Sequence, residues 1–187
     1  MEELLGYGRR CALASAADDN SRVMQTSITA AFSAVLTRDL EGFQKEIALF
    51  PDDETLWETR EGVANSAGNL ALHIAGNIQH FIGQVLGEIP FTRDRNAEFG
   101  RRSGTRQELI AALERALDAV RQVLPRLTVE QLDAPYTGHP DVRASTLQFL
   151  LHLCTHTSFH LGQAGYLRRI VNADGRSTNT VNAARLA

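Results

Sequence analysis

Four long stretches of this chain repeat apolar residues at the 3.6-residue spacing of an α-helix, and none alternates as a strand would. They cover residues 22–50, 66–86, 105–124 and 145–171. Each holds at least about five turns, and four helices of this length are typical of a four-helix bundle. The sequence therefore predicts an all-α fold, with residues 1–187 in a single domain.

Start and stop signals separate these predicted helices. Pro51 follows the first helix and Pro125 follows the third, where each ring interrupts the backbone hydrogen bonds. Capping-box motifs begin at Thr105 and Ser145, directly before the third and fourth helices. A further motif of this kind at Thr128 predicts one short helical turn.

The segment 87–104 contains a proline, many charges and two glycines near its end, and it is predicted to be a long loop. About 17 residues is more than an antiparallel connection needs, so we expect a crossover between the second and third helices. We expect residues 1–20 to be a loosely attached helix or arm. Residues 172–187 are small and polar, and we expect them to pack loosely as well.

Composition excludes several classes of protein. With 43% hydrophobic residues and a net charge of −3, the chain has no basic excess, so we expect no nucleic-acid partner. Its apolar runs are too short to span a bilayer. Cys11 and Cys154 do not make a disulfide framework, which indicates a reducing cytoplasm.

His152, His156 and His160 stand one helical turn apart in the fourth predicted helix. At about 100° per residue, His156 lies in the middle of the core-facing stripe, with the other two about 40° to either side. Cys154 is about 160° away and cannot share their ligand. Burying three imidazoles costs free energy unless their nitrogens find partners, which favours a metal site. Either adjacent pair can bind one ion, and the spacing does not choose between them.

A further ligand must come from another helix. His73 borders the apolar face of the second predicted helix, and Asn77 lies close to it in a polar seam typical of a pocket wall. His80 is the rival ligand, but it lies two turns further along and cannot join His73 on one ion. His139 lies in a Gly-His-Pro loop, where we expect it to be exposed.

Three stretches match a known family: NSAGNLALHIAGN at 65–77, RDRNAEF at 93–99 and HTSFHLGQ at 156–163, followed by YLRR at 166–169. On these residues the chain resembles the DinB/YfiT-like superfamily of metalloenzymes, and in particular a bacterial branch of it. The resemblance covers most of residues 30–171. Its most specific element is His-x3-His-x-Gly-Gln together with one histidine on the second helix.

The resemblance implies a four-helix bundle in which His73, His156 and His160 hold a divalent ion. It leaves His152 outside the set of ligands, and it implies a homodimer. Relatives with known activities are metal-dependent transferases or isomerases that use a low-molecular-weight thiol such as bacillithiol, mycothiol or glutathione.

Three neutral histidine ligands leave an open position on the ion, as in catalytic sites, and zinc or nickel suits imidazole. The chain has no His-Glu-x-x-His motif, which disfavours a metalloprotease. Gln163, His152 and Asn77 are expected to contact a histidine or the substrate. Our first hypothesis is a metal-dependent thiol S-transferase that acts on a small electrophilic substrate. The alternatives are a non-catalytic metal-binding stress-response protein and a metal-dependent hydrolase.

Two groups of charged residues admit structural explanations. In the loop at 93–99, Arg93 and Arg95 either recognise carboxylates of a thiol cofactor or pair with acidic neighbours such as Glu98 and pin the loop. Arg168, near the end of the fourth helix, is expected to complement the helix dipole.

Overall fold

The computed structural model describes the backbone of residues 2–186 and the side chains of residues 23–186. The described residues form helices and no strand, which confirms the all-α prediction. The elements in chain order are α1 (Glu2–Ala48), η1 (Thr55–Trp57), α2 (Ala67–Ile78), η2 (Gln79–Leu86), α3 (Arg95–Gly100), α4 (Arg106–Val123), η3 (Leu124–Arg126), α5 (Val129–Asp133), α6 (Thr146–Asn172) and η4 (Ala183–Leu186).

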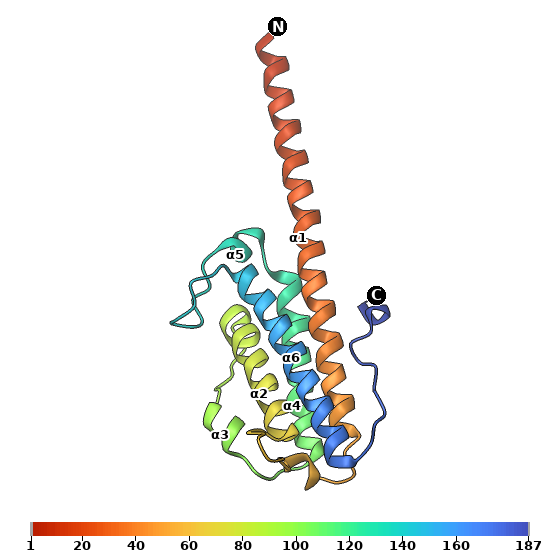
Figure 1. Ribbon diagram of the computed structural model, residues 1–187. Helices are drawn as coiled ribbons and strands as arrows, with labels where there is room; N and C mark the ends of the chain where they lie inside the picture. The colour runs from red at the N-terminus through yellow and green to blue at the C-terminus, as the bar shows by residue number, and fades with distance from the viewer. Residues whose placement is uncertain (1, 187) are drawn as a thin grey trace.

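Four long helices lie side by side along one axis (Figure 1). Helices α1 and α2 each contact both α4 and α6. Helices α2 and α4 run in the same direction, so the segment between them returns along the outside of the bundle (Figure 1). This is the predicted crossover, although the segment also contains the short helix α3, which was expected to be loop. Helix α1 begins at Glu2 and extends well beyond the other helices (Figure 1).

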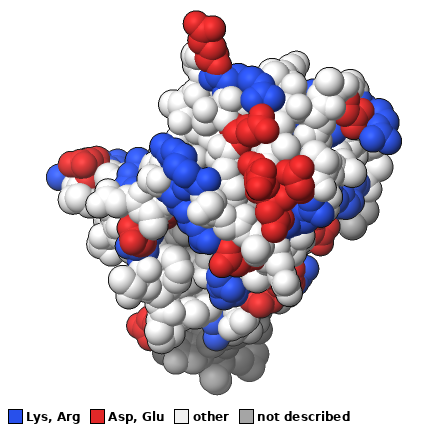
Figure 2. Space-filling model, turned by 90° about the horizontal axis from the view of Figure 1, so that it is seen from below, with Lys and Arg blue, Asp and Glu red and all other residues white. Residues whose placement is uncertain are grey.

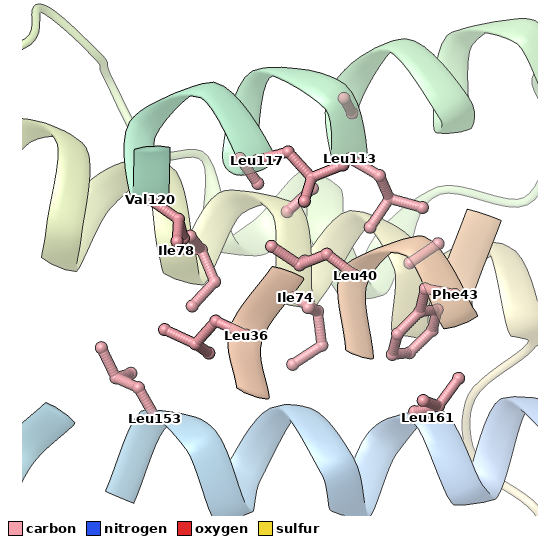
Figure 3. Close-up of a cluster of buried hydrophobic side chains, with 14 of the residues drawn as sticks. Leu36, Leu40, Phe43, Ile74, Ile78, Leu113, Leu117, Val120, Leu153 and Leu161 are labelled. Carbon is pink, nitrogen blue, oxygen red and sulfur yellow. The ribbon is translucent and has the colours of Figure 1, made fainter. Parts of the chain in front are cut away.

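One apolar core joins the four long helices. Side chains from every helix meet in it (Figure 3). Those at its centre are almost fully buried: Leu36, Leu40, Phe43, Ile74, Ile78, Leu113, Leu117, Val120, Leu153 and Leu161. Helix α6 packs its apolar residues against this core and α2 is buried on nearly every side, so the rotation of both helices is fixed, and with it the direction of their polar side chains.

Side-chain caps fix where the helices begin. The predicted capping boxes are present at Thr105, Thr128 and Ser145, and Ser66 forms another at the start of α2. Each cap stabilises its helix by about 1 kcal/mol. The caps of α2 and α6 therefore help to set the axial position of the histidines that follow them.

Helix α2 continues into η2, a π-helical segment that the residue pattern does not predict. Its wider turn changes which side chains face the bundle after Ile78, and π-helical turns occur frequently at functional sites. His80 and Phe81 lie on this segment. Both side chains line the cavity described below.

Arg168 differs from its expected role as a partner of the helix dipole. It is only 1% exposed, and it donates to Glu46 Oε2 at 2.6 Å and to Asp174 Oδ2 at 3.1 Å. The polar C-terminal segment lies against α1, where Thr178 bonds to Glu46 and Thr180 is buried. These contacts join the end of α6, the C-terminal segment and α1.

One face of the molecule carries charges of both signs. Acidic and basic side chains are interspersed on the face in Figure 2, in keeping with the net charge of −3. No helix in the described part of the chain combines the length and hydropathy needed to cross a bilayer.

Candidate metal centre

Three histidines from two helices meet between α2 and α6. His73 Nε2 lies 3.4 Å from His156 Nε2, which lies 3.1 Å from His160 Nε2. One nitrogen of each ring lies within 4.8 Å of the others. We refer to these three residues as the histidine cluster. It pairs His156 with His160 rather than with His152, the choice that helical spacing left open.

The geometry of the histidine cluster fits a single metal ion. Imidazole nitrogens bind zinc at about 2.0–2.1 Å, which separates two ligands of a tetrahedral ion by about 3.4 Å. The observed separations of 3.1 and 3.4 Å agree with this value. The rings are mutually perpendicular within a few degrees, with interplanar angles of 85°, 87° and 88°. The three histidines could therefore hold a divalent ion.

Hydrogen bonds fix the orientation of two of the rings. Glu98 Oε2 lies 3.0 Å from His73 Nδ1, and Gln163 Oε1 lies 2.7 Å from His160 Nδ1. Each oxygen accepts a hydrogen bond from the Nδ1–H group, so the Nε2 lone pair of each ring points toward the centre of the cluster. Both rings point toward His156 Nε2, at 3.4 Å from His73 Nε2 and 3.1 Å from His160 Nε2, and a cation between the three nitrogens could be bound by all of them. A carboxylate–histidine pair of this kind is typical of metal sites.

Glu98 was not singled out as a contact of the histidines. It lies on α3 within the crossover, is 5% exposed, and receives hydrogen bonds from Arg93 Nε at 2.7 Å and Nη2 at 2.8 Å. Burial alone would raise the pKa of Glu98, but the bonds from Arg93 and His73 outweigh it and lower the pKa. The sequence offers Glu98 as a partner for the arginines of the loop, in a stretch that matches the family, but it gives no sign of the contact with His73.

The surroundings favour neutral imidazoles. Burial, followed by the proximity of His160, His73 and His152, lowers the pKa of His156 to about 3. Burial also lowers the pKa of His160, although the bond to Gln163 opposes the change. Metal binding requires deprotonated histidine, so these two rings are ready to bind an ion at neutral pH.

A cavity of about 650 Å³ opens beside the cluster. His73 and His156 form part of its wall, next to Asn77, His80, His139 and His152. The ring of His152 stacks on His156 with centroids 5.5 Å apart, but it stays outside the cluster. His139, expected to be exposed, is partly buried here, and His80 bonds to Gln84 instead of joining His73. All six histidines of the chain thus lie in the cluster or on the cavity wall.

Two buried polar atoms at this site have no hydrogen-bond partner. They are His156 Nδ1 and Asn77 Oδ1. Leaving a buried polar atom unpaired costs about 1–3 kcal/mol, so each atom indicates a missing partner. Asn77 Oδ1 makes no hydrogen bond to a histidine, whereas Gln163 bonds to His160, and a contact of Asn77 with the substrate stays a prediction.

Comparison with known proteins agrees with these features. No curated protein matches the chain. The family model of the DinB superfamily matches residues 36–164, more than half of the chain and a range that includes the whole histidine cluster. The chain therefore belongs to the DinB superfamily.

Proposed function

We propose that the protein is a metal-dependent thiol S-transferase that acts on a small electrophilic substrate. One observation supports this above all: three histidine Nε2 atoms converge at the wall of an open cavity. A structural ion usually has four protein ligands, and in the described part of the chain this cluster has three. The remaining position would face the cavity and accept a small molecule.

The metal would be zinc or nickel, which suit imidazole ligands. When bound, it supplies a Lewis acid that favours the thiolate form of a thiol at neutral pH. In the overall reaction a carbon–sulfur bond forms, the bond from that carbon to its leaving group breaks, and the thiol proton is released.

The chain's own residues orient the ligands and shape the cavity. Glu98 and Gln163 hold His73 and His160 with Nε2 toward the centre. Phe81 and Phe149 line the cavity with ring centroids 5.1 Å apart, which gives it an apolar wall that limits the access of water.

Turnover by protein purified without a tag and loaded with zinc or nickel tests this proposal. Bacillithiol, mycothiol, glutathione and smaller thiols would each be offered with electrophiles such as monochlorobimane. We expect at least one combination to react faster than the uncatalysed mixture, and His156→Ala to abolish the difference. His152→Ala, a histidine change outside the cluster, is the matched control for metal loading.

If the wild type and His156→Ala are equally slow with every combination, the transferase proposal is wrong. A loaded protein that is stable but inert would then favour the non-catalytic metal-binding alternative. Hydrolysis of the electrophile without a thiol would favour the hydrolase.

A further inference from the structure

The cavity beside the histidine cluster has an unbalanced charge. Among the described residues that line it are two arginines and five histidines, but no aspartate or glutamate: His73, His80, Arg93, Arg95, His139, His152 and His156. Imidazole N–H groups and guanidinium groups are hydrogen-bond donors. A cavity with this lining favours a ligand that carries negative charge.

The two arginines differ in what they already bind. Arg93 is paired with Glu98 through two hydrogen bonds, so its charge is neutralised within the protein. Arg95 forms no ion pair with any carboxylate in the described part of the chain. Its guanidinium lies 5.1 Å from the centre of the Phe99 ring, which in turn lies 4.7 Å from His73. Arg95 is therefore an uncompensated cation at the edge of the cavity, on the side of the cluster.

Asn77 is an independent sign of a bound ligand. Its side chain is 6% exposed, lines the cavity and leaves the amide oxygen without a partner. It follows His73 by one helical turn on α2, so both side chains point the same way. A ligand bound at the cluster would pass Asn77, whose amide can then form the hydrogen bond that the protein does not supply.

We propose that the cavity binds a small ligand bearing a carboxylate in addition to its metal-coordinating group, with Arg95 pairing with that carboxylate and Asn77 hydrogen-bonding the polar atoms between. This inference rests on the proposed function in one respect, namely that the metal-coordinating group of the ligand is a thiol. It specifies the class of thiol: an acidic one, with the apolar wall at Phe81 and Phe149 enclosing its carbon chain. The planar guanidinium of Arg95 matches a carboxylate through two parallel hydrogen bonds.

Matched pairs of probes that differ in charge alone test the proposal. The first pair is 3-mercaptopropionate and its neutral analogue 3-mercaptopropionamide, which share the thiol. The second is imidazole-4-acetate and imidazole-4-acetamide, which bind a metal through nitrogen and need no thiol chemistry. Titration calorimetry with the zinc-loaded protein gives the Kd of each probe.

We expect the carboxylate of at least one pair to bind about tenfold more tightly than its amide, the effect of one charge-assisted contact. Arg95→Gln should reduce this ratio to less than about threefold. Arg115→Gln removes an equal charge from an exposed position on α4 that does not line the cavity, and it should keep the full ratio. Because Arg95 is exposed, its replacement should leave folding intact.

The possible outcomes separate this inference from the proposed function. If only imidazole-4-acetate binds more tightly than its amide, and Arg95→Gln removes that preference, the site for an acidic ligand would be supported. The same result would remove the case for a thiol as the metal-coordinating group. Equal binding within both pairs would overturn the inference and leave the transferase proposal standing. A preference that survives Arg95→Gln unchanged would also overturn it, and binding of none of the four probes would refute both ideas.

Discussion

Helix α6 contributes to two polar clusters, each partly buried, that differ in how completely their hydrogen bonds are formed. The histidine cluster has Nε2 atoms of His73, His156 and His160 facing one another, with unpartnered atoms nearby. The second, here called the Arg168 cluster, joins Arg168, Glu46, Asp174 and Thr178. In it, Arg168 Nε, Nη1 and Nη2 each have an acceptor, the last being the carbonyl of Arg176 at 2.5 Å.

The difference separates a structural cluster from a ligand site on the same helix. A buried ion pair in which every guanidinium nitrogen has an acceptor needs no ligand to complete it, and its removal affects folding. A cluster whose ring nitrogens converge and whose neighbouring polar atoms lack partners has its hydrogen bonds completed only when something binds. The contrast predicts that changes in the histidine cluster alter metal binding, and that changes in the Arg168 cluster alter stability.

The largest expected effect is that of His156→Ala on metal affinity. His156 is common to both short nitrogen–nitrogen contacts, so its loss should weaken zinc binding by about three orders of magnitude, a ligand's share of a typical binding free energy. Competition with a chromophoric chelator measures the affinity. His152→Ala should change it less than about tenfold, and an equal loss in both variants would contradict the assignment of ligands.

Next in size is the effect of Arg168→Ala on folding. Removing one partner of a buried ion pair leaves Glu46 without its cation, and we expect a loss of about 3 kcal/mol in the free energy of unfolding. Urea denaturation of the metal-free protein measures it. The neighbouring change Arg169→Ala removes a partly exposed arginine and should cost less than about 1 kcal/mol. Similar losses for both would mean that the Arg168 cluster does not stabilise the fold.

A smaller effect is expected for Glu98→Gln. Glu98 orients His73 without occupying a ligand position, and removal of such a partner typically weakens metal binding by about 10–100-fold. The measurement is again chelator competition, with the exposed Glu61→Gln as the control for loss of one negative charge. An unchanged affinity in Glu98→Gln would show that His73 holds its position without it.

The smallest effect concerns pH and the metal-free protein. The pKa of His156 is lowered from 6.5 to about 3 on folding, mainly by burial. Between these values the unfolded chain binds a proton at this residue and the folded chain does not, so stability should fall as the pH decreases through the window. Urea denaturation at pH 7 and pH 4.5 should show a larger loss in the wild type than in His156→Gln. Equal losses of stability in the two proteins would contradict the lowered pKa of His156.

Much of the fold follows from local signals. The apolar periodicity and the capping motifs at Thr105 and Ser145 placed the starts of α4 and α6 and the end of α1 within a few residues, because both signals act over one or two turns. The start of α1 at Glu2 does not follow from the sequence, since residues 1–20 contain two glycines and no clear apolar stripe. The π-helical segment η2 was missed because a shift in backbone hydrogen bonding leaves no trace in the residue pattern.

The histidine cluster could be predicted only in part, because helical spacing is also a local signal. Spacing gives the angle of each histidine around its helix, but not its height relative to a residue on another helix. The choice of His160 over His152 beside His73 therefore depended on the resemblance to a family. The contact of Glu98 with His73 joins the crossover to α2, and the pairing of Arg168 with Glu46 joins the end of α6 to α1. Because each contact joins segments far apart in the sequence, neither could be predicted from a local pattern.

The gathering of all six histidines around one cavity has a spectroscopic consequence. In a nitrogen-15 NMR spectrum of the side chains, every imidazole resonance would report on this one region, without background from elsewhere in the chain. Tautomers could be assigned ring by ring, and titrating in an ion or a small acid would show which imidazoles respond first.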